Sequence, residues 1–561
     1  MLEIITSLLE GSRNFLPTFL PLFFTISFLL AIIFFALDYS EIKKYFKIRL
    51  SVWVILIFIF LFALSLRLIT PVYLTTYGDE FAHVQVARDI ITSGRAVFNE
   101  PVGFSYVVAL YLLFGGINEN SAYMVNIVTG SLLVVVVFLF CFLLFKSEKT
   151  GLYSAFIVSI LPLYILLSRN IEPDIVSAFF ILLTFTAFLL FFKIRDLKIG
   201  IFAISILAFS ISVKQEGILL IPLVLLLSFI FVDLKQLKEA AKNYKCWLLL
   251  IFFIILAAPH IFHLSLELYP AIFYGKPTAT AVGGHLINIE NIAGSSKTLV
   301  KAIDGTFHPV IINFFVLIGM IYAFKKHRKA GIFLVIFLFL FIFVYLAYSG
   351  FILDRYLITG LVPVIFFAGL GLYAVERLAV SKLHGMARKK IINFSIPLAI
   401  ILVLLLLFVP YFYKLQVDLK PIGMDQGYQR DAIQYKEKEV INTMDEKLDD
   451  CYVVAEEPVL FSATDLKVIR TESVLNDPEP LSHAIKNGER VLYFEDLYCT
   501  DFYSFGNRCG IENESFETCE ELRRKIVSRC REIHENYKLE PYLTYEFGKF
   551  KFAVYNVSLS I

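Results

Sequence analysis

Long apolar runs follow one another through the first 413 residues of the chain, and short polar or basic segments separate them. A helix that crosses the hydrocarbon core of a bilayer needs about 20 apolar residues. Runs that approach or meet this length predict twelve membrane spans. The predicted spans cover residues 16–38, 50–70, 121–145, 151–168, 174–192, 199–213, 217–232, 246–262, 309–324, 330–349, 356–376 and 391–413. We expect the shorter ones to be tilted or buried among their neighbours.

Lys and Arg are concentrated in every second loop between these runs. The basic loops lie at residues 39–49, 146–150, 193–198, 233–245, 325–329 and 377–390. Cytoplasmic loops of membrane proteins carry an excess of positive side chains, so these loops are predicted to face the cytoplasm. The remaining loops, both termini and the tail from about Leu415 then face outward.

The composition excludes an ordinary soluble protein, because 58% of the residues are hydrophobic and only 18% are charged. Glu3 and Glu10 precede the first apolar run, which is too long for the core of a signal peptide, so we interpret it as a span. The net charge of +2 is uninformative by itself, and we expect no nucleic-acid partner. Abundant Lys, Ile and Phe indicate a prokaryotic plasma membrane, with an archaeal one as a candidate.

The hydrophobic period changes after Tyr428, which predicts a separate domain. Residues 431–448 and 515–537 are helix-like, 452–461 and 491–494 are strand-like, and 543–559 resemble a hairpin turning at Gly548-Lys549. We therefore expect an α-helical polytopic membrane protein with a small C-terminal α/β domain. The expected parts are an extra span and cytoplasmic loop at 1–49, a main transmembrane domain at 50–413 with outer loops 71–120 and 263–308, and an extracytoplasmic domain at 414–561.

Closely spaced cysteines in the tail predict disulfides, since an outward compartment can be oxidising. These cysteines are Cys499, Cys509, Cys519 and Cys530, and Cys451 is left over. In one helix, Cys519 and Cys530 would lie ~16 Å apart along the axis, whereas a disulfide needs Cα atoms within about 7 Å. Each must then pair outside the helix.

Unusual charges in or beside the spans fall mostly on the predicted outer side. They are Arg67, Asp79, Glu80, Arg169, Glu172, Asp174, Lys214, Glu216, Asp354 and Arg355. Any one of them is explained as a solvated loop end. A charge within the bilayer costs roughly 2.5–3.5 kcal/mol on insertion scales, so the set as a whole predicts a polar cavity that opens outward.

The segment Tyr77-Gly78-Asp79-Glu80-Phe81-Ala82-His83 places two carboxylates at the rim of a span. Asp79 and Glu80 are the predicted catalytic residues, with Asp79 as a general base that deprotonates a hydroxyl and His83 one turn beyond it. One alternative is a helix cap. Another is a divalent metal ion held by Asp79, His83 and either His260 or His263, although such a site needs three or four converging ligands.

Five further outer residues are candidates for binding a substrate. Arg169 and Asp174 flank Pro173 at the start of a span, where Asp174 also suits a helix cap. Lys214 and Arg355 either pair with these carboxylates or bind a phosphate, and Arg is the better suited to fork onto phosphate oxygens. Arg355-Tyr356 also fits an interfacial anchor pair.

Two outer segments suggest surfaces for a ligand. The apolar segment 104–114 is too short to span, so we expect an interfacial helix on the outer leaflet that holds a lipid-linked substrate. The loop 263–308 contains Gly283-Gly284-His285 and is either a lid or a disordered connector.

The order of these motifs resembles the polyprenyl-phosphate-sugar-dependent GT-C glycosyltransferases, closest to the protein O-mannosyltransferase and aminoarabinose transferase group. The motifs are the acidic pair, the Gly-closed apolar segment, Asp174, the Lys of Ser212-Val213-Lys214-Gln215-Glu216-Gly217, and Asp354-Arg355-Tyr356-Leu357 followed by Pro363. The chain departs from the pattern at Glu100-Pro101-Val102-Gly103, where the family often has Lys/His-Pro-Pro. It also lacks the Trp-Trp-Asp motif of oligosaccharyltransferases, since its only tryptophans are Trp53 and Trp247.

The resemblance implies transfer of a sugar, of hexosyl or mannosyl type, from a polyprenyl phosphate to a hydroxyl of a protein, lipid or glycan. It also implies an Asp base in the first outer loop and basic residues on the donor phosphate. The alternative is a lipid-linked-sugar flippase or transporter. A transporter should carry ionisable or helix-breaking residues near the midplane of its spans, and here the span centres are almost purely apolar.

The charge pattern yields a topology that labelling can check. Lys326 and Lys389 should be cytoplasmic, whereas Asn513 and Asn556, both in Asn-x-Ser sequons, should be outside. A membrane-impermeant reagent should therefore modify the tail of intact cells. Labelling of the tail only after lysis would reverse the orientation.

Overall fold

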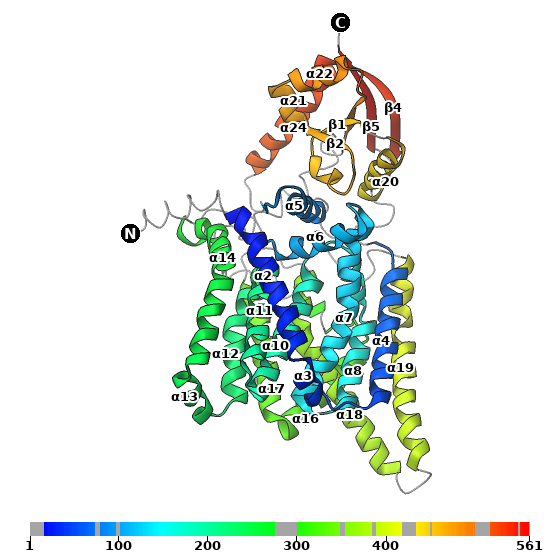
Figure 1. Ribbon diagram of the computed structural model, residues 1–561. Coiled ribbons are helices and arrows are strands. Elements are labelled where there is room, and N and C mark those ends of the chain that lie inside the picture. The colour runs from blue at the N-terminus through cyan, green and yellow to red at the C-terminus, as the bar shows by residue number, and fades with distance from the viewer. Residues whose placement is uncertain are drawn as a thin grey trace.

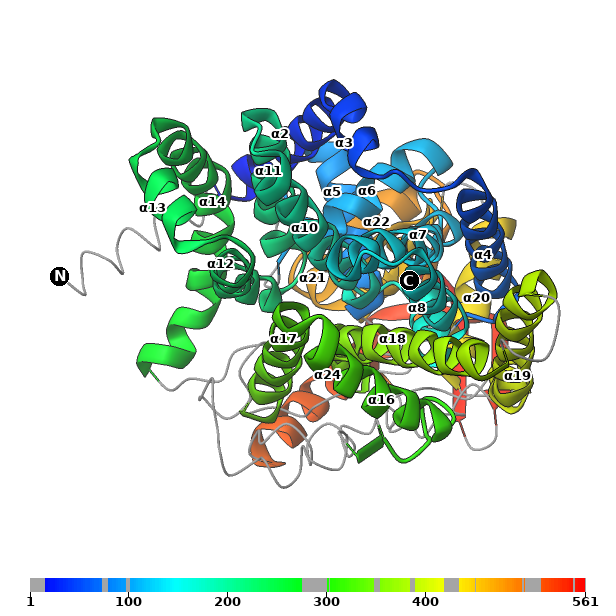
Figure 2. The ribbon, with the colours of Figure 1, turned by 90° about the horizontal axis from the view of Figure 1, so that it is seen from below.

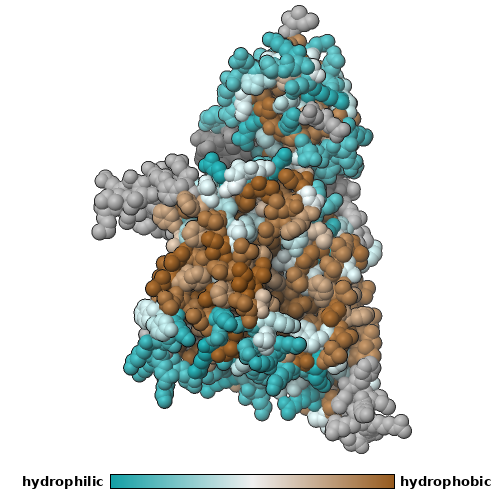
Figure 3. All heavy atoms as spheres, in the orientation of Figure 1, coloured by the Kyte–Doolittle hydropathy of each residue, from teal (hydrophilic) through white to brown (hydrophobic). Residues whose placement is uncertain are grey.

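The apolar runs of the sequence form a bundle of helices beneath a small sheet domain, as Figure 1 shows. The computed structural model describes residues 16–72, 79–96, 101–274, 300–301, 303–347, 354–383, 389–417, 433–448, 451–496, 499, 516–547 and 550–559. In Figure 3 a band of hydrophobic side chains covers the visible face of the bundle, between a hydrophilic lower end and the largely hydrophilic C-terminal domain. Such a band is what a bilayer requires of a multi-pass membrane protein.

Each predicted span coincides with a helix. The helices are α2 (Leu16–Leu37), α4 (Leu50–Ile69), α7 (Glu119–Phe145), α8 (Glu148–Ile160), α10 (Asp174–Ile194), α11 (Leu197–Val213), α12 (Leu220–Phe231), α14 (Tyr244–Tyr274), α16 (Ile311–Lys326), α17 (Arg328–Ala347), α18 (Leu357–Leu383) and α19 (Lys389–Val417). Within the described residues, 7 helices are long and apolar enough to cross a membrane, and a bent pair brings this to 8. The prediction of a polytopic helical protein is confirmed, whereas the count of twelve spans is not.

The bent pair is the predicted fourth span. Helix α8 ends at Ile160, and α9 (Pro162–Leu166) with η1 (Leu167–Arg169) continues at an angle of 59°. Pro162 occupies the first turn of α9, where its missing N–H is not needed, but it cannot continue the ladder of α8. The break turns the chain across the end of the bundle just before Asp174.

The bundle is arranged around α7, α8 and α10, with α4 and α19 at one side, as the view from below shows (Figure 2). The short basic helices α3 (Tyr39–Tyr45) and α13 (Leu234–Lys242) lie at the end of the bundle opposite the C-terminal domain (Figure 1). One end of the bundle therefore carries basic helices and the other end carries the C-terminal domain, as the charge pattern predicts. Helix α14 runs beyond His263 to Tyr274, and the rest of the predicted lid, residues 275–299, lies outside the described residues.

Two short helices, α5 (Asp79–Ser93) and α6 (Gly103–Gly115), form a layer between the bundle and the sheet (Figure 1). The expectation that α6 lies on the outer leaflet is wrong for most of its length, because residues 103–109 are buried. Gly103 packs so closely on Ser212 of α11 that a Cβ would lie 2.5 Å from the Ser212 carbonyl oxygen. Only the end of α6 is open, where Phe114 is 92% exposed.

The C-terminal domain is built on a five-stranded sheet of order β2-β1-β3-β5-β4. Its strands are β1 (Tyr452–Ala455), β2 (Lys467–Arg470), β3 (Val491–Glu495), β4 (Tyr537–Phe547) and β5 (Phe550–Leu559). Strand β1 pairs in parallel with β2 and β3, whereas β5 is antiparallel to β3 and β4. The predicted strand 452–461 is shorter than expected, since Pro458 begins a 3-10 turn, η6 (Pro458–Phe461). The predicted hairpin is present, and its turn at Gly548-Lys549 lies outside the described residues.

Alternate residues of a strand point to opposite faces of the sheet, and here both faces carry buried apolar side chains. Helices therefore cover both faces. They are α20 (Ile433–Lys447), α21 (Thr471–Asn476), α22 (Glu479–Lys486) and α24 (Phe516–Asn536). Val453 packs with Met444 of α20 on one face, and Val454 packs with Leu481 of α22 on the other. The prediction of a small α/β domain is confirmed, although the sequence pattern did not reveal β2, α21 or α22.

Helix α5 joins the C-terminal domain to the bundle. Phe81 is buried within the core of that domain, and its carbonyl oxygen accepts a hydrogen bond of 2.9 Å from Ser462. One guanidinium nitrogen of Arg88 donates to the carbonyl oxygen of Thr464 at 2.9 Å. Beside α5, Lys438 of α20 pairs with Glu119 at the start of α7.

The structure pairs Cys499 with Cys530 in a disulfide whose Cα atoms lie 5.8 Å apart. Cys530 lies on α24 and its partner lies outside that helix, as the helix geometry requires. Cys451 is buried and takes part in no disulfide among the described residues. The side chain of Cys519 lies outside the described part of the chain, as does Cys509.

Loss of this disulfide should destabilise the C-terminal domain by about 2–4 kcal/mol, because it closes a loop of 31 residues. We expect Cys530→Ser to lower the midpoint of thermal unfolding of the purified protein. Cys246→Ser serves as the control, since that half-buried thiol lies in α14 and takes no part in the disulfide. Non-reducing peptide maps of the wild type should contain a Cys499–Cys530 peptide, and two alkylated thiols at these positions would contradict the pairing.

Candidate active site

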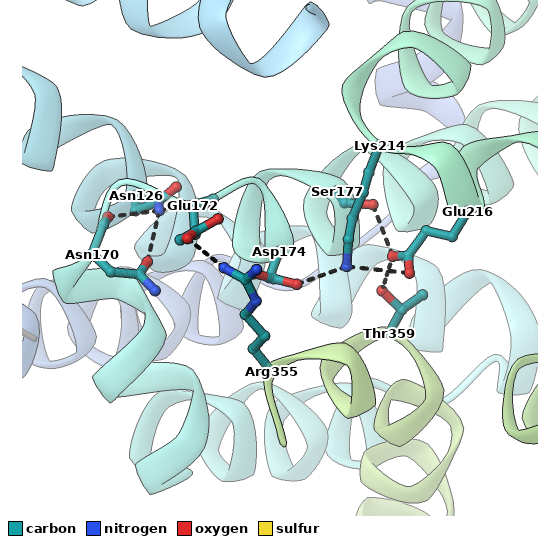
Figure 4. A network of polar contacts seen from close by, with 9 residues as sticks. All are labelled: Asn126, Asn170, Glu172, Asp174, Ser177, Lys214, Glu216, Arg355 and Thr359. Carbon is teal, nitrogen blue, oxygen red and sulfur yellow. Dashed lines mark hydrogen bonds and ion pairs between the residues drawn. The ribbon is translucent and has the colours of Figure 1, made fainter. Parts of the chain in front are cut away.

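Buried charged and polar side chains meet at the end of the bundle that faces α5 (Figure 4). They come from segments far apart in the sequence: α7, the loop 170–173, α10, the segment after α11, η5 (Asp354–Tyr356) and α18. Nine of them are drawn in Figure 4: Asn126, Asn170, Glu172, Asp174, Ser177, Lys214, Glu216, Arg355 and Thr359. We call these nine side chains the charged cluster.

Asn126 of α7 fixes the loop before α10. Its side-chain nitrogen donates to the carbonyl oxygens of Asn170 and Glu172, both at 2.8 Å. All three residues are buried, so these carbonyl groups would otherwise lack water as a partner. The loop is thus held in one shape, with Glu172 and Asp174 directed into the cluster (Figure 4).

Arg355 of η5 forms an ion pair with Glu172 of this loop, and the side chains are 11% and 3% exposed. A buried cation that loses its partner is strongly destabilising, so the pair connects η5 firmly to the loop. The sequence left two roles open for Arg355, and the structure shows the carboxylate pairing.

Lys214 lies between two carboxylates. Its ammonium group is 2.7 Å from Asp174 Oδ1 and 3.3 Å from Glu216 Oε2, and all three side chains are at most 10% exposed. The other oxygen of Glu216 accepts hydrogen bonds from Ser177 at 3.2 Å and Thr359 at 2.7 Å. Glu216 therefore holds Lys214 in place while it connects α10 to α18.

Gly217 explains how Lys214 and Glu216 come to the same place. A Cβ at this position would lie 2.5 Å from the carbonyl oxygen of Ser210 and 2.8 Å from the Cα of Ile211. The chain after Lys214 therefore turns back against the end of α11 at a distance that only glycine allows. This close turn directs both side chains into the charged cluster.

The predicted catalytic pair begins α5, directly beside this cluster. Glu80 is fully buried, and its Oε2 accepts a hydrogen bond of 3.1 Å from the backbone N–H of Ile171. Ile171 belongs to the same loop as Glu172. Asp79 is the first residue of α5, and its side chain lies outside the described part of the chain.

His83 is buried one turn further along α5. Its Nδ1 lies 3.0 Å from the hydroxyl of Ser105, and its ring meets Phe104 edge-on. Burial, together with the positive charge of Arg355, lowers the pKa of His83 to about 3. The imidazole is therefore neutral near pH 7.

Tyr356 and Arg169 occupy different surroundings. The ring of Tyr356 lies under both cations of the cluster, 4.7 Å from the Lys214 nitrogen and 5.4 Å from the Arg355 guanidinium carbon. Arg169 instead lies over the ring of Tyr123 at 6.0 Å, and Lys438 lies over the same ring at 4.8 Å. The structure thus brings Tyr356 to the charged cluster, whereas Arg169 faces the contact with α20.

Arg67 lies within the bundle at the break between α8 and α9. This fully buried guanidinium donates to Ser168 Oγ at 3.0 Å and to the Ser159 carbonyl oxygen at 3.5 Å. These partners lie on either side of the break between α8 and α9. Gly130 leaves the necessary room, because a Cβ there would collide with Ser168 Oγ and lie 3.0 Å from Arg67 Nε.

A metal site is not visible in the part of the chain that the structure describes, where no three His, Cys, Asp or Glu side chains are placed to hold one ion. His260 is buried in α14 and stacks on Phe24 of α2, with ring centroids 4.5 Å apart. Since the side chain of Asp79 is not among the described groups, the metal hypothesis stays untested.

Sequence reasoning missed the neutral members of the cluster. Asn126, Ser177 and Thr359 each stand within an apolar run and look like ordinary span residues. Asn126 could have been singled out from the sequence, because an amide inside a span must find partners in the protein. Which cation pairs with which carboxylate depends on the fold, and the sequence does not show this pairing.

A comparison with known protein families matches the part of the chain that contains most of the charged cluster. Residues 99–263 match the profile of the family described as dolichyl-phosphate-mannose-protein mannosyltransferase. This match covers less than half of the chain. No curated protein sequence matches.

Solved structures share the fold at low identity. ArnT from Cupriavidus metallidurans is 10% identical with a TM-score of 0.56, over 90% of this chain and 97% of ArnT. ArnT bound to undecaprenyl phosphate gives a TM-score of 0.52 with the same identity and coverage. The archaeal oligosaccharyltransferase AglB from Archaeoglobus fulgidus, in complex with an inhibitory peptide and a dolichol-phosphate, is 12% identical with a TM-score of 0.53, over 91% of this chain and 74% of AglB.

The chain is therefore a multi-pass membrane protein with the GT-C fold, and the predicted resemblance to this superfamily is confirmed. At these identities the structural likeness shows the fold alone.

The contacts of Glu216 predict how two substitutions in the charged cluster change the stability of the protein. Glu216→Gln keeps oxygen and nitrogen atoms near Ser177 and Thr359 but removes a charge next to Lys214, so it should destabilise the protein by about 1–3 kcal/mol. Thr359→Val removes one hydrogen bond to the same carboxylate and should cost less, about 1 kcal/mol. Thermal unfolding in detergent measures both. An unchanged unfolding midpoint in Glu216→Gln would mean that the charge of Glu216 contributes nothing to stability.

Proposed function

We propose that this protein is a membrane glycosyltransferase that moves a sugar from a polyprenyl phosphate to an acceptor hydroxyl. The match of residues 99–263 to a dolichyl-phosphate-mannose-dependent family supports this proposal and a donor of hexosyl or mannosyl type. So does the GT-C fold, since ArnT binds undecaprenyl phosphate and AglB binds a dolichol-phosphate. The basic loops support an active site on the outer face of a prokaryotic plasma membrane.

The hydrogen bond from Ile171 to Glu80 is the observation that carries the proposal. It attaches the first turn of α5, and with it Asp79, to the loop whose Glu172 and Asp174 pair with Arg355 and Lys214. An acid–base residue and two cations from distant parts of the chain thus lie at one end of the bundle. A transferase from a lipid phosphate needs both kinds of group.

The reaction divides the roles among these groups. Asp79 takes the proton of the acceptor hydroxyl as its oxygen bonds to the anomeric carbon of the sugar. The bond from this carbon to the phosphate oxygen breaks, and the polyprenyl phosphate leaves with the electron pair. Arg355 and Lys214 stabilise the negative charge that develops on the leaving oxygen.

The carboxylate partners of these cations tune this step. Glu172 and Asp174 keep Arg355 and Lys214 charged and oriented while the site is empty. A phosphate must therefore share a cation with a carboxylate already there. Arg355 suits this sharing, because a guanidinium has several donors in one plane and binds two oxygen-rich partners at once.

Two substitutions test the division of roles. Asp79→Asn should remove nearly all turnover, a loss of about 10²–10⁴-fold, while donor binding stays measurable. Arg355→Ala should weaken donor binding and turnover together, since it removes a phosphate contact and leaves Glu172 without its cation. The assay is the release of radiolabelled sugar from a panel of polyprenyl-phosphate sugars by purified protein in detergent.

Controls separate the proposal from its rivals. A flippase has no activity in detergent, so sugar transfer there excludes that alternative. Retained turnover in Asp79→Asn would make Asp79 a helix cap and direct the test to Glu80 or Asp174. Loss of turnover on chelation, restored by a divalent ion, would favour the metal-bound role of Asp79.

A further inference from the structure

Helix α13 (Leu234–Lys242) connects α12 to α14 at the end of the bundle opposite the C-terminal domain (Figure 1). In the view from below it lies at the outer edge of the bundle (Figure 2). The two helices beside it keep apolar side chains on their surface, since Phe229 of α12 is 64% exposed and Ile251 of α14 is 53% exposed. Exposed apolar side chains on a membrane bundle contact lipid, so the bilayer surrounds the corner at which α13 lies.

Apolar and basic side chains occupy neighbouring faces of α13. Leu234 and Leu237 are one turn apart and share a face, and Leu234 is exposed. With 3.6 residues per turn, the three lysines of the helix fall within about 60° of one another, directly beside the leucines. We call these three residues the α13 lysines: Lys235, Lys238 and Lys242. A basic face beside an exposed apolar face is typical of a helix that lies in the interface of a membrane.

Aromatic side chains mark the level of the membrane interface next to α13. Tyr244 and Trp247 lie in the first turn of α14, shortly after Lys242, and they are 67% and 55% exposed. Tyr and Trp are enriched where acyl chains meet headgroups, because their apolar rings carry a polar group. The start of α14 therefore lies at the headgroup level, and the short connection to α13 keeps that helix beside the headgroups.

The α13 lysines are exposed, and within the described residues no ion pair joins them to a carboxylate. Other cations at the same end of the bundle have such partners, as in the pairs Arg49–Glu148 and Lys149–Glu376. Residues 233–245 contain four Lys, one Asp and one Glu, which gives this segment a net charge of +2. The segment therefore presents positive charge that the protein itself leaves available to an anion.

We propose that α13 lies in the headgroup layer of the membrane and binds anionic phospholipids, with its leucines among the acyl chains and the α13 lysines on the phosphate groups. A cluster of four or more basic residues on or beside an amphipathic helix is typical of segments that bind anionic lipids, and Lys245 is the fourth here. A second copy of the chain fits this surface less well, because two segments of charge +2 repel each other. The inference does not depend on the proposed sugar transfer.

The two tryptophans of the chain allow a direct test, because one of them, Trp247, lies next to α13. Trp53→Phe leaves Trp247 as the single reporter. The full-length variant is placed in nanodiscs of phosphatidylcholine and phosphatidylglycerol, about 3:1, with bromine on the acyl chains of one lipid at a time. Bromine quenches tryptophan fluorescence on contact. We expect Trp247 to prefer phosphatidylglycerol at least about threefold over its share of the lipid. A nanodisc offers both leaflets, so the test is independent of orientation.

Two triple variants locate the attraction. Replacing the α13 lysines with glutamine should bring the lipid preference at Trp247 to about one, because a neutral amide does not attract a phosphate. About 1 M KCl should reduce the preference of the unsubstituted segment in the same direction. The matched control removes three exposed cations near α4, on another side of the bundle (Figure 2), and should leave the preference at Trp247 unchanged. It carries Lys43→Gln, Lys44→Gln and Lys47→Gln.

A second pair of variants tests how α13 lies. In a chain with Trp53→Phe and Trp247→Phe, the single reporter is introduced either by Leu234→Trp on the apolar face or by Glu239→Trp, which lies about 140° around the helix. If the apolar face enters the acyl chains, brominated lipid quenches the reporter of Leu234→Trp strongly and that of Glu239→Trp weakly.

Several results would overturn the inference. A preference at Trp247 that survives loss of the α13 lysines, or that falls equally in the control variant, rules out α13 as the binding segment. Equal quenching at the two positions of α13 rules out a helix that lies in the interface. Absence of quenching at both positions refutes contact with lipid, and nanodiscs that then hold two copies of the chain would assign this surface to an interface between copies.

Discussion

Charges buried where water is scarce must find partners within the protein, and this requirement organises the outer end of the bundle. These charges come from three segments: Glu172 and Asp174 lie at the start of α10, Lys214 and Glu216 follow α11, and Arg355 belongs to η5. Lys214 also pairs with Glu216 two residues away, but Asp174 and Arg355 find their partners only in another segment. Helices α10, α11 and α18 therefore become fixed relative to one another by electrostatics as well as by apolar packing.

Helix α5 extends this constraint beyond the membrane. Glu80 accepts a hydrogen bond from the loop of the charged cluster, whereas Phe81, the next residue, inserts into the core of the C-terminal domain. Neighbouring residues of one helix thus hold two domains.

Neutral side chains complete the site at least as much as the charged ones do. Asn126 holds the loop by its carbonyl groups, and Ser177 and Thr359 hold Glu216. Because each cation already has a carboxylate partner, the protein bears much of the cost of burying these charges before any ligand arrives. Such preorganisation is the condition under which fixed charges stabilise a transition state best.

The sequence by itself determined that most of the chain forms apolar helices of a membrane bundle, that the two ends of this bundle differ, that the tail is an α/β domain, and which family the chain resembles, because length, hydropathy and charge act locally along the chain. It also selected Asp79, Lys214 and Arg355 as unusual. Only the tertiary structure decided that α6 is buried, that α8 breaks at Pro162, and that Arg355 pairs with Glu172. These features depend on contacts between residues far apart in the chain, and the partner of a charge is set by which segments the fold brings within a few ångströms.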